Sequence, residues 1–557
     1  MNKTLKGGNQ MKGVKQTLSV FLCVILACSS FGIGAQAKTA KKYVKSISIA
    51  KKATVTIPAL KGKVTKSFKV TVKVNGKASK KFTAKSSKTE VATVKVSGSN
   101  VKVTAKKAGS TKITVTTKAK SAKGKKLSKT LALTVKKNNP PMPDDYPTYP
   151  VGNLSRDGYE LEQVVIFSRH NIRAPLSSGG SVLGTITPYT WFNWSSNPSE
   201  LSLRGGVLET EMGQFFRKWL EAEKLIPENY HPDENEVRVY ANSKQRTIAT
   251  AKYFTAGLLP TAKTEIETKG EFNTMNPVFT PQLTFCNDEY SADAEKQIWD
   301  LYADKVKGLS DNYKMISDII DFENSEAYKK GEVPAFSTDD SEIVLKENAE
   351  PAVKGTLKTA CSVSDALVLQ YYEAPTAIEA AFGKNLTYNE WKQVSEVKDV
   401  YGDVLFTAPL IASNVAHPLL QEINKELTTD GRKFTFLCGH DSNIGSLLAA
   451  MGVKDYELPG AIEAKTPIGS KLVFSRWKNA KSEKFCTVDL VYQTTEQLRN
   501  VSLLDLTVHP SIMPMYFNGI TANSDGLYTE SDFMGLMKKS IDEYDNIIAK
   551  YNIAKAA

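Results

Sequence analysis

The residues of this chain best suited to chemistry surround His170, which stands between Arg169 and Arg173. An apolar run, 164–167, precedes them and Pro175 follows. Such a run, rich in β-branched residues, is typical of a buried strand that ends in a loop. Ligands bind at the carboxyl ends of strands in open α/β sheets. Guanidinium groups bind phosphate and a neutral imidazole can attack phosphorus, so the trio suits phosphoryl transfer, with a surface Arg-His pair as the alternative.

A second histidine, His440, follows another apolar run, 434–438, far downstream. Asp441 and Asn443 come next, and their short polar side chains suit the first turn of a helix. The apolar spacing over 444–451 predicts that helix. His440 would then lie at a helix N-terminus, where phosphate is favoured.

Taken together, these motifs resemble the histidine acid phosphatases, the branch of the histidine phosphatase superfamily that includes bacterial phytases and glucose-1-phosphatases. The resemblance covers roughly residues 151–545, and Asn171 with the segment 173–176 brings it closest to the glucose-1-phosphatases. The matching segments are Arg169-His170-x-x-Arg173-x-Pro175, Tyr240-Ala241-Asn242-Ser243, Gln245 to Ala251, Gly439 to Leu448 and Thr466-Pro467-Ile468-Gly469.

The resemblance implies a two-step hydrolysis of phosphomonoesters, among them sugar phosphates such as glucose 1-phosphate and also phytate. His170 is expected to attack phosphorus, and Asp441 to protonate the leaving alkoxide and then to serve as base for water. Glu373 is the expected contact to the leaving group, although Ala374 and Pro375 follow it where a Gly-rich continuation is usual. The expected phosphate-binding residues are Arg169, Arg173, Arg246 and His440.

No metal or other cofactor is expected, because these positive side chains supply the charge that Mg²⁺ supplies in other phosphatases. The other histidines lie before prolines, and His417-Pro418 is predicted to end a helix. Two rival functions remain open. One is a phosphomutase of the same superfamily, and the other is a wall-bound adhesion protein that uses the phosphatase fold as a scaffold.

Length and composition predict a multidomain protein of 557 residues. We expect a small all-β immunoglobulin-like sandwich followed by an α/β phosphatase core, with a mainly α-helical cap inserted over 280–360 by analogy with the family. The predicted domains are a signal peptide (1–37), the sandwich (38–137), a proline-rich linker (138–150) and the phosphatase domain (151–557).

The first 37 residues have the pattern of a secretory signal peptide. Lysines precede an apolar stretch, 18–28, and Ala35-Gln36-Ala37 supplies a small-x-small cleavage site. The protein is therefore expected to be secreted or associated with the cell wall, with a lipid anchor on Cys28 as the alternative. No later run is long enough to span a membrane. Of the four remaining cysteines, Cys438 is expected to be a buried thiol, and Cys286 with Cys361 is a candidate disulfide.

Charge separates the two halves of the chain. Residues 1–137 contain 33 Lys, no Arg or Asp and only Glu90, a net charge of +32; because the whole chain carries +14, the rest carries −18. Alternating runs with turn signals between 44 and 135 predict a β-sandwich, and the segment 86–115 resembles bacterial immunoglobulin-like (group 2) repeats. The lack of Arg and the few aromatic residues argue against specific nucleic-acid binding. We expect the module to bind anionic cell-wall polymer, with a merely solubilising surface as the alternative.

Overall fold

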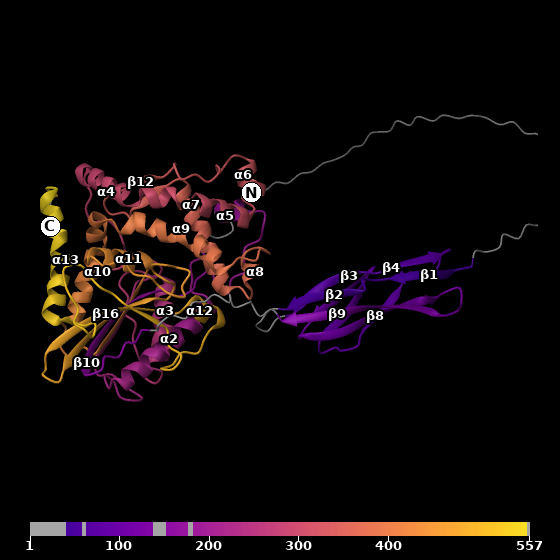
Figure 1. The fold of residues 1–557 in the computed structure, drawn as a ribbon, viewed down its shortest axis with the longest axis horizontal. Coiled ribbons are helices and arrows are strands. Elements are labelled where there is room, and N and C mark those ends of the chain that lie inside the picture. Colours follow the sequence, from indigo (N-terminus) through magenta and orange to yellow (C-terminus); the bar gives the residue numbers. More distant parts are fainter. Residues whose placement is uncertain (1–40, 58–62, 138–151, 177–181, 554–557) are drawn as a thin grey trace, which may run out of the picture. The chain divides into compact units, whose positions relative to one another are not determined.

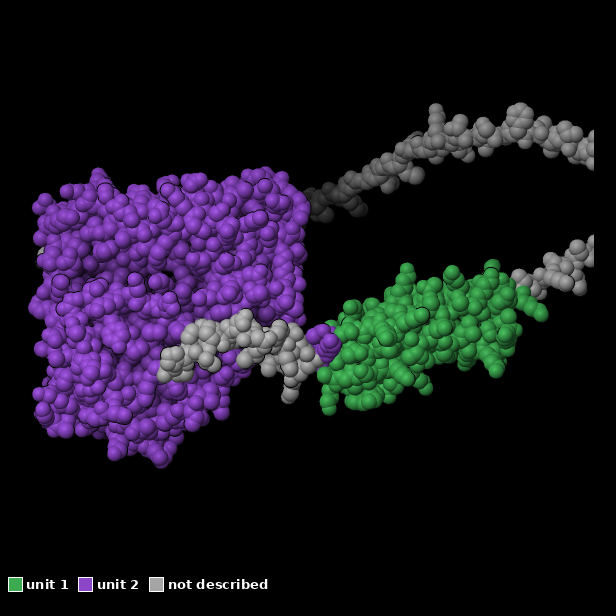
Figure 2. Space-filling model, viewed as in Figure 1, with its two compact units in different colours: residues 1–55, 64–135 green, residues 56–63, 136–557 purple. Residues whose placement is uncertain are grey.

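The computed structural model describes residues 41–57, 63–137, 152–176 and 182–553. The predicted signal peptide and proline-rich linker lie outside these ranges. The chain forms two compact units, one of residues 1–55 and 64–135 and one of 56–63 and 136–557 (Figure 2). Among the described residues, no helix combines the length and apolar character needed to cross a membrane.

The first unit consists of short antiparallel strands whose alternate residues are buried. A four-stranded sheet has the order β2-β9-β8-β5, a three-stranded sheet has the order β3-β7-β6, and β1 pairs with β4. Val101, Val103, Ile113, Val115 and Leu131 are fully buried, as a two-residue repeat requires of a half-buried sheet. The strands are β1 Tyr43–Ser48, β2 Lys52–Ile57, β3 Val64–Lys69, β4 Thr71–Asn75, β5 Phe82–Ser86, β6 Ala92–Ser97, β7 Asn100–Ala105, β8 Gly109–Lys120 and β9 Lys126–Lys137.

The second unit is built on a mixed seven-stranded sheet (Figure 1). Its order is β11-β14-β10-β15-β16-β17, and β18 also pairs with β16. β10, β14 and β11 run parallel, whereas β15 to β18 join antiparallel. The strands are β10 Tyr159–Arg169, β11 Val237–Ala241, β14 Phe434–Gly439, β15 Lys471–Asn479, β16 Lys484–Tyr492, β17 Ser511–Pro514 and β18 Tyr528–Thr529.

Helices cover both faces of this sheet, because its central strands are apolar on both sides. Val164 and Ile166 of β10 pack into one core with α2 and α3, and Val165 and Phe167 pack into a second core with α10, α11 and α13. Figure 1 shows the sheet between these two helical layers. The helices are α2 Leu203–Ala222, α3 Gln245–Leu258, α10 Pro409–Leu427, α11 Asp441–Ala450 and α13 Glu530–Lys550; α12 Thr495–Asn500 and α1 Val182–Thr185 are shorter.

A mainly helical cap is inserted between β11 and β14, and its buried residues form a core that also includes residues of α10, α12 and α13. It extends further along the chain than the expected 280–360, because α7 and α9 pack into the same core and carry it to residue 406. The cap elements are α4 Asp288–Lys307, α5 Ser310–Ile320, η1 Phe322–Asn324, α6 Glu326–Lys329, β12 Glu342–Val344, β13 Ala352–Lys354, α7 Thr356–Glu373, α8 Ala377–Ala380 and α9 Tyr388–Phe406.

The predicted helix end at His417-Pro418 is wrong. Pro418 lies inside α10, which continues to Leu427. Ala416, Leu419 and Leu420 on either side of the proline are buried against the sheet. Tertiary packing on this face therefore holds a helix that the local sequence predicts to stop, despite the hydrogen bond that proline removes.

Candidate active site

Three parallel strands bring the two histidine motifs together at one edge of the sheet. Arg169 at the end of β10 is level with Gly439 at the end of β14, and Ala241 of β11 is level with Cys438. The backbone N–H of His170 then donates to the Gly439 carbonyl oxygen at 3.0 Å. As a result, the ring centroids of His170 and His440 lie 5.5 Å apart.

The ring of His170 is oriented by its own loop. Its Nδ1 lies 2.9 Å from the backbone oxygen of Asn171. Because a carbonyl oxygen can only accept, Nδ1 donates, and the neutral ring keeps the lone pair of Nε2 available for attack. Burial, followed by the charges of Arg246 and Arg173, holds the pKa of His170 well below its usual value. Both effects favour the neutral imidazole over the imidazolium.

A buried ion pair supports the His170 loop from below. Lys471 Nζ lies 2.7 Å from Glu209 Oε1, and neither side chain is exposed to solvent. The Asn171 amide donates to the other oxygen of Glu209 at 2.9 Å, and Lys471 also donates to the Ser168 hydroxyl at 3.1 Å. The donors and acceptors beneath His170 are thus paired with one another, which fixes the loop.

His440 is held by Asn242, the first residue after β11. The Asn242 side-chain oxygen accepts from the backbone N–H groups of Ser243 and Asn276, so its amide nitrogen must face His440 Nε2, 2.7 Å away. Nε2 is therefore an acceptor, and the neutral ring carries its proton on Nδ1. Burial and the charge of Arg246 hold the pKa of His440 well below its usual value.

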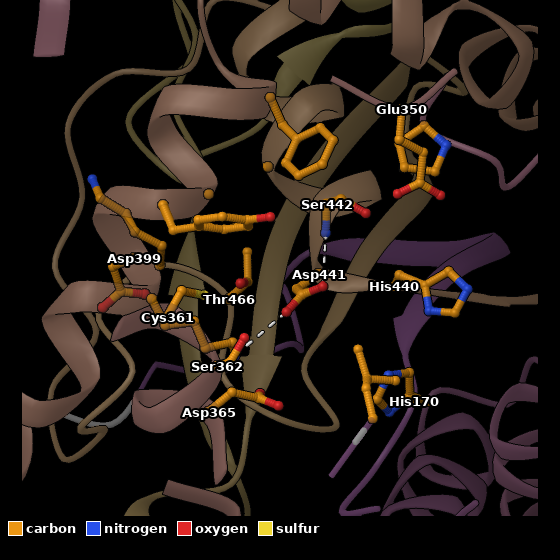
Figure 3. Close-up of a pocket in the computed structure, with 18 of the residues that line it drawn as sticks. His170, Glu350, Cys361, Ser362, Asp365, Asp399, His440, Asp441, Ser442 and Thr466 are labelled. Atoms are coloured by element: carbon orange, nitrogen blue, oxygen red, sulfur yellow. Dashed lines mark hydrogen bonds and ion pairs between the residues drawn. The ribbon is translucent and has the colours of Figure 1, made fainter. Parts of the chain in front are cut away.

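Asp441, at the start of α11, is partly exposed to the cleft. Figure 3 shows it with His170 and His440 on one side and Asp365 and Asp399 on the other. Its Oδ1 accepts from the Ser442 backbone N–H at 3.0 Å. Desolvation alone would raise the pKa of Asp441, but the charges of Arg169 and Lys398 hold it well below its usual range.

Two arginines present guanidinium groups to the cleft. Arg173 pairs with Asp365 at 3.0 Å, and Arg246 lies in the first turn of α3. Burial, followed by the charge of Arg173, lowers the pKa of Arg246 to about 10, so it stays protonated at working pH. No described residue accepts a hydrogen bond from the buried Nε of either arginine. An unpaired buried donor costs free energy that an anion can offset.

Arg169 lies behind Asp441 and does not line the cleft. Its side chain is 1% exposed, with NH1 2.7 Å from Glu463 Oε1 and NH2 3.3 Å from Asp441 Oδ2. NH1 also donates to the Thr466 backbone oxygen, and no described residue accepts from its Nε. In this conformation Arg169, one of the expected phosphate-binding residues, is thus engaged with acidic side chains.

Glu373 lies away from the other expected site residues. It ends α7, accepts a hydrogen bond from the Ser202 hydroxyl at 2.8 Å and does not line the cleft. Ser202 is the N-cap of α2, so Glu373 braces a helix start. The sugar contact expected of Glu373 stays a prediction.

The expected Cys286–Cys361 disulfide is wrong, because both side chains are free thiols. Cys361 faces the cleft from α7, whereas Cys286 precedes α4 and packs against the cap core. Cys438 is a buried free thiol, as predicted. No cluster of three or more His, Cys, Asp or Glu side chains suited to a metal occurs in the described part of the chain.

His170, Arg173, Arg246, His440 and Asp441 line a cleft of about 570 Å³. The cleft is also lined by residues that sequence reasoning missed. Lys398, Asp365 and Glu350 line it. Lys398 and Asp365 lie on helices whose pattern gives no sign of a site. Glu463, which pairs with Arg169, precedes the matched segment 466–469 by three residues, and that proximity is the one signal that could have pointed to it.

Both parts of the chain match known protein families. The model of the histidine phosphatase superfamily (branch 2) matches residues 160–493, and that of the bacterial Ig-like domain (group 2) matches 43–127. A glucose-1-phosphatase of Providencia rettgeri is 37% identical over 391 residues, which cover 69% of this chain and 92% of that protein. A glucose-1-phosphatase of Salmonella typhimurium is 36% identical, with 70% and 92% covered.

Solved phytase structures share the fold of the second unit. The Hafnia alvei phytase in complex with myo-inositol hexakis sulphate is 26% identical to this chain, with a TM-score of 0.63. The match covers 70% of this chain and 99% of the phytase chain. The phytase from Citrobacter braakii is 25% identical with the same TM-score and coverage. The expected multidomain fold is thereby confirmed, and the chain is a phosphomonoester hydrolase that belongs to branch 2 of the histidine phosphatase superfamily.

Proposed function

We propose that this protein is a secreted phosphatase that hydrolyses sugar phosphates such as glucose 1-phosphate through a covalent phosphohistidine on His170. One observation supports this most strongly. Beside the neutral ring of His170, Arg173 and Arg246 each hold a buried Nε without an acceptor among the described residues. A phosphoryl group at that point would satisfy both donors and lie next to the nucleophile.

In the first step, the lone pair of His170 Nε2 forms a bond to phosphorus while the bond from phosphorus to the leaving oxygen breaks. Asp441 gives its proton to that oxygen. The free carboxyl group has a depressed pKa, but binding of an anionic phosphate replaces part of the positive surroundings with negative charge and raises the proton affinity of Asp441. Arg173, Arg246 and the Nδ1–H of His440 stabilise the charge on the phosphoryl oxygens.

In the second step, water attacks the phosphohistidine and the phosphorus–nitrogen bond breaks. Asp441, now ionised, accepts the proton of the attacking water, and His170 returns to its neutral form. Arg169 would turn from Asp441 toward the phosphate when the substrate is bound. Every proton and electron pair is then accounted for by these side chains and water.

The charges around the cleft favour a sugar monophosphate over a highly phosphorylated inositol. Six cationic residues line the cleft, and five acidic residues oppose them. Carboxylates accept hydrogen bonds from sugar hydroxyls, whereas they repel further phosphate groups. The acidic residues are Glu350, Asp365, Asp399, Asp403 and Asp441; burial raises the pKa of Asp399 to about 7, so this one is largely protonated in the acid range.

A substrate panel tests this proposal. The purified chain should release phosphate from glucose 1-phosphate with a higher kcat/KM than from phytate, and from p-nitrophenyl phosphate as well. A strong preference for phytate would overturn the sugar-phosphate assignment. Transfer of phosphate to a second sugar hydroxyl instead of to water would favour the phosphomutase alternative.

For the first unit, we propose binding to anionic cell-wall polymer through its lysines. Their charge is opposed by a single acid, Glu90, in residues 1–137. Lysines such as Lys73, Lys102 and Lys112 lie on strands with exposed side chains. A dense one-sign surface on an exported protein attracts polyanions in a manner that salt weakens.

A further inference from the structure

Four charged side chains, one of them the proposed proton donor Asp441, form a closed group. Glu463 Oε1 lies 2.7 Å from Arg169 NH1 and 2.6 Å from Lys398 Nζ. Both cations also reach Asp441 Oδ2, Arg169 at 3.3 Å and Lys398 at 3.4 Å. Asp441 therefore faces two cations whose charge is partly neutralised by one shared carboxylate.

Glu463 is buried, held by hydrogen bonds and ionised. It is 1% exposed, and its second oxygen accepts from the Ile468 backbone N–H at 2.7 Å and the Tyr372 hydroxyl at 3.2 Å. Although burial opposes its ionisation, the charges of Arg169 and Lys398 lower the pKa of Glu463 to about 2. It is therefore ionised throughout the range in which an acid phosphatase works.

Lys398 differs from Arg169 in its position. Its side chain is 12% exposed, extends from α9 of the cap and lines the cleft, whereas Arg169 is buried at the end of β10. The pKa of Lys398 is raised despite its desolvation and the nearby Arg169, because Glu463 and Asp441 favour its charged form. A cap helix thus places a fixed positive charge beside a group of the α/β core.

Other titratable groups also face Asp441 from the elements packed around it. His170, His440 and Arg246 come from the α/β core. The groups that the cap contributes are Glu350, Cys361, Asp365 and Tyr401. In the described part of the chain, Arg169 and Lys398 are the cations that form ion pairs with the Asp441 carboxylate.

We propose that Lys398, balanced by Glu463, is a positioning residue that orients Asp441 and sets the pH above which this donor loses its proton. The inference rests on the proposed role of Asp441. Removing the Lys398 charge should let Asp441 hold its proton to higher pH. Removing the Glu463 charge should have the opposite effect, because the positive charge of Lys398 beside Asp441 would then be uncompensated.

The experiment measures single-turnover rates of glucose release from glucose 1-phosphate, at saturating enzyme, as a function of pH. The alkaline limb of this profile reports loss of the proton that the leaving oxygen needs. Lys398→Met should move the limb up by about one to three pH units, the usual effect of one close opposite charge. Glu463→Gln should move it down, and Lys398→Arg should leave it in place.

Two controls separate positioning from substrate attraction and from structure. Lys358→Met removes an exposed lysine that lines the same cleft without an ion pair to Asp441, and the limb should not move. The double variant Lys398→Met/Glu463→Gln removes one charge of each sign and should return the limb toward that of the wild type. p-Nitrophenolate leaves without a proton, so the profile on p-nitrophenyl phosphate should respond less.

An unshifted limb in folded Lys398→Met, or a shift of equal size in Lys358→Met, would overturn the inference. If Lys398→Met does not fold, Glu463→Gln decides, and an upward or absent shift there contradicts the proposal. A wild-type protein that releases neither glucose nor p-nitrophenol would instead contradict the proposed function. A wild type that is active on both substrates, with unshifted variants, contradicts this inference alone.

Discussion

The tautomer and charge of the proposed nucleophile, His170, are set by the backbone and by burial instead of by a neighbouring carboxylate. His170 Nδ1 donates to the Asn171 carbonyl, which fixes the tautomer without adding a negative charge. A carboxylate in that place would raise the pKa of the ring and favour imidazolium, which cannot attack phosphorus. The arginines have the opposite effect, so the charges that we propose to bind phosphate also favour the neutral imidazole.

Replacing the nucleophile tests this directly. His170→Ala should abolish turnover, because no other described imidazole faces the cleft with an orientation fixed for attack. The substitution removes volume beside solvent and should leave the fold intact. Rapid quenching with ³²P-labelled substrate should label the wild type and not the variant, and circular dichroism checks the fold. Residual turnover near the wild-type rate in a folded variant would refute the covalent mechanism.

A second residue-scale prediction concerns Asp441→Asn. A sugar alkoxide needs a proton in order to leave, whereas p-nitrophenolate does not, so hydrolysis of glucose 1-phosphate should fall by about 10²- to 10⁴-fold. The loss on p-nitrophenyl phosphate should be smaller, and kcat/KM on both substrates measures the difference. Equal losses would mean that Asp441 positions the phosphate, with Glu373 the next donor to test.

The same proton requirement makes activity on alkyl phosphates peak on the acid side of neutrality. The pKa of His170 is depressed, so acid does not readily protonate the proposed nucleophile, whereas a rise in pH removes the proton that Asp441 is proposed to donate. The pH profile of wild-type hydrolysis of glucose 1-phosphate checks this expectation. An optimum above pH 7 would contradict it.

At the scale of elements, strands were the most predictable part of the site. The apolar runs 164–167 and 434–438 lie within β10 and β14, and the polar residues after them meet at the sheet edge as expected. A buried parallel strand can be predicted from sequence because both of its faces are apolar. The role of Lys398 could not be predicted from the sequence. One lysine on an amphipathic helix gives the same pattern whether it faces solvent or an aspartate from another element.

The crossing of α2 and α3 offers a prediction about packing. Gly213 and Gly257 let the helices touch, since a Cβ on Gly213 would lie 2.1 Å from the Phe254 backbone oxygen. Gly213→Ala should therefore lower the free energy of unfolding by about 1–3 kcal/mol, as overpacking does. Because α3 carries Arg246, phosphate binding should weaken as well. Urea denaturation followed by fluorescence measures the first effect and KM the second.

The matched control is Gly535→Ala in α13. Gly535 is exposed, and no atom lies within 4 Å of the position that its Cβ would take. Alanine is the better helix former, so the substitution should be neutral or stabilise by up to about 1 kcal/mol. Similar losses in both variants would mean that the close helix crossing is not the cause.

At the scale of the molecule, the two units differ in chemistry as well as in fold. The all-β unit carries its charge on lysines, whereas residues 138–557 have a net charge of −18. This division could be predicted from the sequence, because the lysine-rich composition ends at the proline-rich segment 138–150. It could not show how far the cap extends, since α7 and α9 join it through contacts between residues distant in sequence.

This division predicts that catalysis and retention can be separated. A chain that begins at Asp144 should keep the kcat/KM of the full-length protein, because every described residue lining the cleft lies beyond residue 144. It should lose binding to teichoic-acid-containing cell walls, since its remaining charge is negative. The full-length protein should bind these walls at low salt and be released as salt rises toward about 1 M. At that ionic strength the Debye length is about 3 Å, so charges further apart than this hardly attract one another.

Binding of the full-length protein that does not weaken with salt would contradict an electrostatic mechanism and indicate a built ligand site in the sandwich. Equal wall binding by the two chains at low salt would place the determinant in the phosphatase unit. A matched control is the full-length protein with Lys73, Lys102 and Lys112 changed to Gln. These exposed strand residues contribute charge without core packing, so this variant should keep both its fold and its activity while it elutes from the walls at lower salt.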